Sequence, residues 1–372
     1  MERHTTRRAV LAGVGVACLA GCVGRRRSGE NATTATETAG REEQTTRGAS
    51  PPTRGEHLPL PMDPVSLRDR AVSGGPPKDG IPSIDDPNFV SAEAESVRLN
   101  PGDPVFGVTT GNTTKAYPQS ILVQHEICND TIDDTPVSVT YCPLTGTAMG
   151  FERGDTTFGV SGRLINNNLI MYDRATEAWW PQVLATSIPG PWKEEPPTRS
   201  LQEFRVVWTT WERWTSKHPE TEVLSRDTGH ARNYDYDPYG SYDPRRGYYS
   251  LREPPMFPAL FEDDRLQPKD IVIGARTPGG AVAFQKHRLS EEKLVESTLD
   301  ETPVLAVYEP DLHTGYVYRN PEQRQYEYED GQIRDADGDT HPPEDLPLTR
   351  ILAFDAMWFA WYGFYPDTTL YA

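Results

Sequence analysis

The stretch Thr135-Pro-Val-Ser-Val-Thr-Tyr-Cys142 decides the fold class, because apolar and polar side chains alternate along it. Alternation of this kind is typical of a β-strand, whose odd-numbered residues point to one face and even-numbered residues to the other. Residues 121–129 read as a second strand, and the polar segment 130–135 reads as the turn between them. We therefore expect a β-hairpin that ends at Cys142.

The same pattern returns 167 residues later, as Thr302-Pro-Val-Leu-Ala-Val-Tyr-Glu309. Across residues 103–143, 13 of 41 positions are identical to those 167 further on without a gap, where chance would give about three. These matches predict a mainly β fold (α+β, few helices) built from two related β-rich units that arose by internal duplication. We expect the first unit, with a helical and aromatic insertion, over residues 61–265, and a degenerate second unit over 266–372.

Comparing the two copies separates structural residues from candidate functional ones. Features that both copies keep, such as Gly107 and Gly274, are most simply turn chemistry and core. Four side chains of the first copy change their chemistry in the second: His125 becomes Glu292, Glu126 becomes Lys293, Cys128 becomes Val295 and Cys142 becomes Glu309. We therefore expect any chemistry to lie in the first unit.

The candidate catalytic residues are Cys142, His125 and Glu126. One hypothesis is a nucleophilic or redox-sensing thiol whose pKa is lowered by His125 or by a carboxylate. A second is a soft-metal site, for example for copper, formed by Cys142, His125 and Met149. A third is that Cys142 is a small buried residue and His125 a hydrogen-bonded core histidine. His125 and Glu126 are consecutive on the expected preceding strand, so at most one of them shares the face of Cys142.

Both cysteines of the body, Cys128 and Cys142, are expected to be free thiols. In the hairpin, Cys128 would lie opposite about Val137, and Cys142 would lie roughly five residues further along at ~3.4 Å each. A disulfide requires Cα atoms within about 7 Å of each other. The turn that follows Cys142, with Pro143 and Gly146, could bring its thiol to a surface or cleft.

A different class of function is a non-catalytic surface module that binds a small ligand, a glycan or a protein partner. The chain has 17 Tyr and 8 Trp, and aromatic side chains at a cleft give a large contact area at low entropic cost. Its candidate ligand-binding residues are Arg163, Asp173, Trp180 and Gln182. The alternative for the polar members of this set is a buried network that holds strand register.

The N-terminus reads as an export signal with a lipid anchor. The pair Arg7-Arg8 precedes an apolar run at residues 9–20, which is too short to span a bilayer as a helix. It ends in Leu19-Ala-Gly-Cys22, which resembles a lipobox, so residues 1–22 predict a twin-arginine lipoprotein signal. We expect Cys22 to carry the lipid and the protein to be extracytoplasmic, anchored to the outer face of the cell membrane. Residues 23–60, rich in Thr and acidic side chains, predict a flexible tether.

The charge excludes one class of partner. The formal net charge is -18 at pH 7, and losing residues 1–21, with three Arg and one Glu, would make it -20. No basic face is available to neutralise phosphates, so nucleic acid is excluded as a partner. The acidic residues are scattered rather than clustered, which favours work in concentrated salt over a single basic partner. We therefore expect a halophilic protein.

Several motifs resemble the family known as domain of unknown function 3179. They are Gly74-Gly-Pro-Pro-Lys-Asp-Gly-Ile-Pro82, His125-Glu-Ile-Cys-Asn-Asp130, Tyr141-Cys-Pro-Leu-Thr-Gly146, Phe158-Gly-Val-Ser-Gly162, Met171-Tyr-Asp-Arg-Ala-Thr-Glu177 and Trp358-Phe-Ala-Trp-Tyr362. The resemblance covers about residues 62–372 and implies an often exported protein without an established activity. The chain departs from the family pattern at Thr145, where a second cysteine often stands, and at Cys128, where an aliphatic residue is usual. Chemistry of the Cys-x-x-Cys kind is therefore excluded.

Overall fold

A computed structural model describes residues 49–111 and 113–372 of the chain. The signal at 1–22, its lipid-anchor residue Cys22 and most of the expected tether lie outside the described residues. Residues 49–60 of that tether belong to the body instead: Leu58 is fully buried, and its backbone N–H donates to the hydroxyl of Ser200 at 2.7 Å. Leu58 is part of the hydrophobic core, so this stretch is not a tether. No helix among the described residues is long and apolar enough to cross a membrane.

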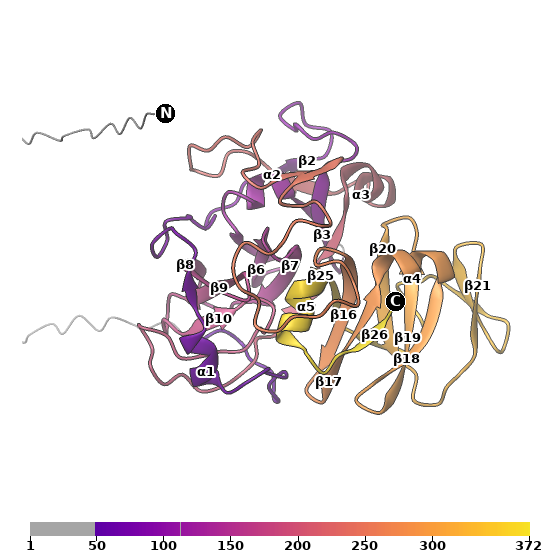
Figure 1. Cartoon of the computed structure of the whole chain (residues 1–372). Helices are drawn as coiled ribbons and strands as arrows, with labels where there is room; N and C mark the ends of the chain where they lie inside the picture. The colour runs from indigo at the N-terminus through magenta and orange to yellow at the C-terminus, as the bar shows by residue number, and fades with distance from the viewer. Residues whose placement is uncertain (1–48, 112) are drawn as a thin grey trace, which may run out of the picture. The chain divides into compact units, whose positions relative to one another are not determined.

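Two sheets form the first β-rich region (Figure 1), with strand orders β12-β3-β4-β13-β2 and β11-β7-β6-β5. Their strands are antiparallel neighbours, except that β13 joins β4 in parallel. The bounds are β2 Phe89–Ser91, β3 Pro104–Thr110, β4 Thr113–Pro118, β5 Ile127–Ile132, β6 Thr135–Cys142, β7 Thr147–Glu152, β11 Glu203–Phe204, β12 Val207–Thr210 and β13 Glu222–Leu224. The strand expected at 136–142 is β6, which begins one residue earlier, at Thr135.

The second β-rich region repeats this plan in the orders β25-β16-β17-β26 and β18-β19-β20-β24. Even the parallel contact recurs: Glu222 lies opposite Lys115 in one region, and Thr369 lies opposite Val282 in the other. The bounds are β16 Ile271–Thr277, β17 Gly280–Gln285, β18 Leu294–Leu299, β19 Thr302–Glu309, β20 Thr314–Arg319, β24 Thr349–Ile351, β25 Ala353–Met357 and β26 Thr369–Tyr371.

One glycine–tryptophan contact is the same in both regions. A Cβ atom added to Gly107 would lie 2.2 Å from the ring of Trp214, and one added to Gly274 would lie 2.2 Å from the ring of Trp361. Each indole therefore packs directly on strand backbone, which only glycine permits. This explains why both copies keep a glycine at this position of the strand.

The remaining elements lie between or beside these sheets. Residues 158–173 form a β-hairpin with its turn at Asn166-Asn167. The strands are β1 Val72–Ser73, β8 Phe158–Ile165, β9 Asn168–Asp173, β10 Trp179–Pro181, β14 Gly240–Tyr242, β15 Arg245–Gly247, β21 Tyr326–Glu329, β22 Gln332–Asp335 and β23 Thr340–His341. The helices are α1 Pro64–Asp69, α2 Gln119–Leu122, α3 Trp211–Lys217, α4 Lys286–Glu292 and α5 Trp358–Phe364. The described part of the chain is thus mainly β, as expected.

Local geometry corrects two details of the expected hairpin. Residues 119–122 form α2, so His125 and Glu126 lie in the turn between α2 and β5 rather than on a strand. Cys128 pairs with Val139 instead of Val137, because the turn is a tight one at Asp133-Asp134, both with positive φ. The sequence pattern missed α2 because its apolar residues continue directly into the strand.

Strand β6 is buried on both faces. Its odd-numbered face and Cys128 belong to one hydrophobic cluster, and Cys142 belongs to another, together with Met149 and Phe151. The aromatic run at 357–365 forms α5 and is buried in the same cluster as Cys142. From residue 49 on, the chain is one compact unit.

Candidate functional site

Cys142 lies at the end of β6 inside the protein, with 1% of its surface exposed. Its thiol donates to the carbonyl of Asn167 at 3.5 Å and accepts the backbone N–H of Leu169 at 3.4 Å. Burial raises the pKa of Cys142 to about 11, and the nearby charge of Glu126 raises it further. Cys142 and Cys128 are both buried free thiols. The expectation that they do not form a disulfide is confirmed. In this conformation Cys142 is neither accessible nor ionised at neutral pH.

Glu126 is the member of the His125–Glu126 pair that approaches Cys142. Its side chain is 7% exposed and forms no hydrogen bond or ion pair with any described residue. Burial raises the pKa of Glu126 to about 8. Its φ of 61° is left-handed, but Lys293 at the equivalent turn has φ 69°. The unusual backbone is therefore a property of the turn, whereas the buried carboxyl group is specific to the first region.

His125 points away from Cys142. The imidazole contacts the carbonyl of Pro82 through Nδ1 and the hydroxyl of Tyr234 through Nε2, each at 2.7 Å. Because a carbonyl can only accept, Nδ1 carries the proton and Nε2 accepts from the tyrosine. Burial lowers the pKa of His125 to about 4. His125 is thus a fully hydrogen-bonded core histidine that connects three separate segments.

The three residues of the expected soft-metal site are not brought together. Met149 and Cys142 share one face of the sheet and one hydrophobic cluster, but both ring nitrogens of His125 are bonded elsewhere. Among residues 49–111 and 113–372, no group of three or more His, Cys, Asp or Glu side chains could hold a metal ion. The geometry therefore offers no support for a copper site at Cys142.

The expected ligand-binding residues fall into separate places. Trp180 donates its indole N–H to Asp173 at 2.9 Å, and both are buried. Gln182 is buried beneath β6, where it donates to the hydroxyl of Thr140 at 2.9 Å. Arg163 is exposed and belongs to neither group. The hydrogen bonds inside the protein are therefore the role of Asp173, Trp180 and Gln182. The bond from Gln182 to Thr140 also explains the polar face of β6, because the hydroxyls of that face bond buried side chains rather than a ligand.

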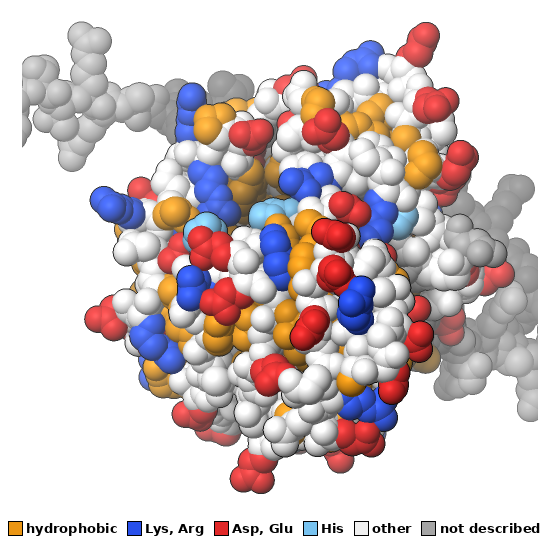
Figure 2. Space-filling model, turned by 90° about the vertical axis from the view of Figure 1, so that its right-hand side faces the viewer, with side chains coloured by type: hydrophobic (Ala, Val, Ile, Leu, Met, Phe, Trp, Pro, Cys, Tyr) orange, Lys and Arg blue, Asp and Glu red, His pale blue; other side chains and the backbone are white. Residues whose placement is uncertain are grey.

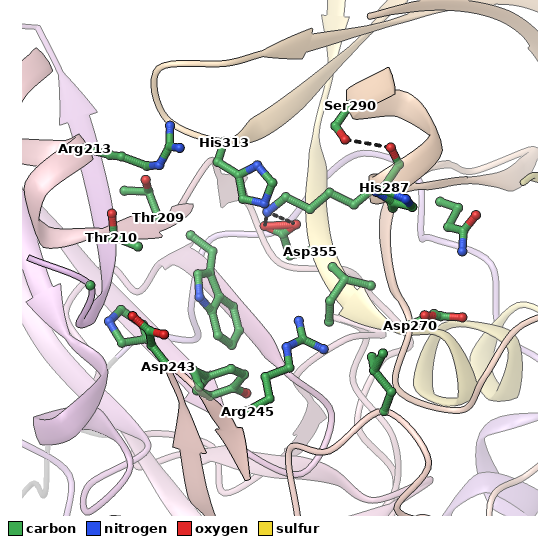
Figure 3. A pocket seen from close by; sticks show the side chains of 18 residues that line it. Thr209, Thr210, Arg213, Asp243, Arg245, Asp270, His287, Ser290, His313 and Asp355 are labelled. Atoms are coloured by element: carbon green, nitrogen blue, oxygen red, sulfur yellow. Dashed lines mark hydrogen bonds and ion pairs between the residues drawn. The ribbon is translucent and has the colours of Figure 1, made fainter. Parts of the chain in front are cut away.

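A pocket of about 560 Å³ lies between α3 and α4 (Figure 3), and none of the expected site residues lines it. We call it the α3–α4 pocket. Its lining comes from β12 and α3 of the first region, from α4, β25 and the β19–β20 turn of the second, and from the hairpin β14–β15. Trp208 and Tyr242 form one wall, with ring centroids 5.2 Å apart and nearly perpendicular planes. Its volume lies in the range of pockets that hold small molecules.

Lys286 and Asp355 form a buried ion pair in the lining, with Lys286 Nζ 3.0 Å from Asp355 Oδ1 (Figure 3). The first region has Gln119 and Trp208 at the equivalent positions of its sheet. The ion pair is therefore specific to the second region. Because the two side chains are only 11% and 5% exposed, each depends on the other for its charge.

His313 presents its imidazole to the same pocket from the turn between β19 and β20 (Figure 3). Its φ is 51°, and the equivalent residue of the first region is Gly146, with φ 61°. A histidine thus occupies a left-handed position where the first region has glycine, and histidine is one of the non-glycine residues found most often in that conformation. Burial lowers the pKa of His313 to about 4, and so do nearby cationic groups, first Lys286 and Arg213.

Two side chains of the lining have polar atoms without a full set of partners. Thr209 is 4% exposed, and its buried hydroxyl has no hydrogen-bond partner among the described residues. Arg213 uses one nitrogen, Nη1, to donate to the carbonyls of Pro310 and Asp311 at 2.6 and 3.0 Å. Buried polar atoms without partners, such as the Thr209 hydroxyl, are rare in proteins. The guanidinium of Arg213 is exposed, and its other nitrogens remain free to bind a further group.

The sequence differences that single out the first β-rich region do not include any residue of this pocket. Lys286 and His313 differ in the opposite sense, because they stand in the second region where the first has Gln119 and Gly146. No comparable difference between the two regions marks the aromatic wall or the arginines of the pocket. These side chains come together only because segments far apart in the chain pack against each other.

Searches of curated proteins and of solved structures found no match. A family model with the description "Protein of unknown function (DUF3179)" matches residues 78–368. The match spans both β-rich regions and therefore includes the surroundings of Cys142 and the α3–α4 pocket. The chain belongs to this family of proteins of unknown function, as its motifs had indicated.

Proposed function

We propose that this protein is a binding protein that holds a small ligand in the α3–α4 pocket. The observation that carries the proposal is a pocket of about 560 Å³ with converging side chains from both β-rich regions. Its lining combines an aromatic wall, a buried ion pair and a buried hydroxyl without a partner. A few polar groups on a largely apolar wall is the usual composition of a small-molecule site.

Filling the pocket tests this proposal. Leu251 lines the pocket and is 42% exposed, so Leu251→Trp adds bulk without disturbing the core. The matched control is Met256→Trp, which places the same ring on an exposed residue outside the lining. A library of small polar metabolites is screened by ligand-observed NMR against the full chain with Cys22→Ser, which lacks the expected lipidation site.

The expected result is a set of ligands that bind the parent and the control but not Leu251→Trp. If the parent binds no compound of the library, or if binding persists unchanged in Leu251→Trp, the proposal is wrong.

We propose, in addition, that the protein works outside the cell as a lipoprotein in concentrated salt. The twin-arginine signal, the lipobox ending at Cys22 and the net charge of -18 support this. A Cys22→Ser variant is expected to move from the membrane fraction to the medium, and the melting temperature of the protein is expected to rise with salt concentration. A variant that stays in the membrane fraction would contradict the lipid anchor.

The proposal that the body arose by internal duplication is supported by the shared element order, sheet order and register. The recurrence of the parallel contact is the strongest support, because β13 and β26 follow insertions of different length yet pair at equivalent residues. If this proposal is right, the α3–α4 pocket formed at the contact between the two copies, after their sequences had diverged.

A second candidate function is thiol chemistry at Cys142. One observation favours it: Glu126, a buried carboxyl group without a described partner, lies close enough to influence the thiol. A carboxylate in this position can act as a base towards a thiol. Because Cys142 is 1% exposed, this function requires that the side chains which cover the thiol move to admit a substrate.

A further inference from the structure

The electrostatics of the α3–α4 pocket differ from those of the rest of the protein. The chain as a whole is strongly acidic, yet two exposed arginines, Arg213 and Arg245, line this pocket. Neither forms an ion pair within the described part of the chain; Arg245 has only a 3.5 Å contact with the carbonyl of Lys269. Figure 2 shows basic and histidine side chains gathered near a hollow on one face, while acidic side chains are spread over the surface.

Three acidic side chains belong to the lining, and none of them pairs with either arginine. Asp355 pairs with Lys286 at 3.0 Å, Asp270 accepts the backbone N–H of Gln267 at 2.9 Å, and Asp243 forms no ion pair with a described residue. Arg213 and Arg245 therefore keep their charged groups without a carboxylate partner. In an acidic protein, arginines without carboxylate partners at a pocket are the expected recognition elements for an oxyanion.

The field around His313 gives an independent indication of sign. After burial, the groups that lower its pKa are Lys286, Arg213, Arg245 and Lys293, and all of them are cationic. The charges that act most strongly on His313 are therefore positive, which agrees with the two arginines of the lining.

We propose that the α3–α4 pocket selects a small organic anion. Its oxyanion group lies in the positive field of Arg213 and Arg245, and its apolar body packs against Trp208 and Tyr242. This inference rests on the proposed ligand-binding function and deepens it by naming the class of ligand.

Matched probes separate charge from shape. Benzoate and benzamide are nearly isosteric, but only benzoate is an anion, and phenyl phosphate carries a different oxyanion on the same ring. Affinities are measured by NMR titration on the full chain with Cys22→Ser, at constant salt. Both anions are expected to bind at least about 10-fold more tightly than benzamide. Which of the two anions binds more tightly distinguishes a carboxylate ligand from a phosphate ligand.

Substitution of the arginines tests their role. Arg245→Gln and Arg213→Gln are each expected to bring the benzoate affinity close to that of benzamide, without lowering the benzamide affinity. The matched control is Arg252→Gln, an exposed arginine outside the lining, which is expected to keep the preference for anions. Arg213 also anchors a turn, so Arg245→Gln is the decisive variant if Arg213→Gln melts at a lower temperature.

The outcomes separate this inference from the function on which it rests. If benzamide binds as tightly as both anions, or if Arg245→Gln retains the full preference, anion selection is wrong while small-ligand binding stands. If neither the probes nor the metabolite library bind, the ligand-binding function itself is wrong.

Discussion

Replacing Glu126 by glutamine isolates the effect of burying a carboxyl group without a partner. Glutamine has nearly the same shape but does not ionise. In the folded protein burial raises the pKa of Glu126 from 4.5 to about 8. Between these two values the folded state holds a proton that the unfolded chain has lost, so the stability of the parent falls as pH rises. The free energy of unfolding of the variant does not decrease for this reason, because glutamine does not ionise.

The shift also sets the size of the effect. At about 1.4 kcal/mol for each pKa unit, the variant gains on the order of 5 kcal/mol over the parent between pH 4.5 and 8, as an upper bound. The gain is absent below pH 4.5, where both states are protonated, and constant above pH 8. Urea unfolding of parent and Glu126→Gln at pH 5, 7 and 9 measures the difference in the free energy of unfolding.

The control is Glu327→Gln, which removes an exposed carboxyl group and is expected to leave the pH dependence of the parent unchanged. If the free energies of unfolding of the parent and Glu126→Gln stay parallel from pH 5 to 9, Glu126 is not buried as an uncompensated acid. The reasoning that connects it to the thiol of Cys142 would then fail as well.

Three further predictions concern the core. Gly107→Ala brings a Cβ to within 2.2 Å of the Trp214 ring, so it is expected to lower the free energy of unfolding by about 1–3 kcal/mol; an unchanged urea midpoint would contradict this packing. Because burial raises the pKa of Cys142 to about 11, thiol labelling of the folded chain at pH 8 should be roughly 100-fold slower than that of the unfolded chain. Rapid labelling of either Cys142 or Cys128 in the folded state would show an opening that the structure lacks. His125→Phe leaves a buried carbonyl and hydroxyl without their partner and is expected to destabilise the protein by about 2 kcal/mol, whereas a variant as stable as the parent in urea would contradict that role.

Local patterns in the sequence were sufficient for the strands and for their repetition. The alternation along 135–142 specifies β6 because side-chain direction in a strand depends only on residue parity. The match at an offset of 167 residues predicts strands in the region of β16 to β19, because equivalent turns and core positions need the same residues. Where helix and strand share apolar residues, as at 119–132, the pattern could not separate α2 from β5.

The candidate site depended on contacts that local patterns do not encode. The expectation that at most one of His125 and Glu126 meets Cys142 agrees with the structure, but the turn after α2, not a strand, determines that it is Glu126. The polar face that ends at Cys142 was interpreted as leading to a surface or cleft. It is covered instead by buried polar residues such as Gln182, whose position depends on how a later hairpin packs.

The sequence by itself determined the mainly β class, the free thiols Cys128 and Cys142 and the family. It did so because periodicity, spacing and composition act over short distances along the chain. It also carries the internal match on which the proposed duplication rests. The α3–α4 pocket was decided by the tertiary structure alone. Its lining runs from Gly102 to Asp355 and converges only when the two β-rich regions pack against each other. The charge of a pocket depends on which side chains remain unpaired after folding. The order of residues along the chain does not specify these pairings, because they form between distant segments.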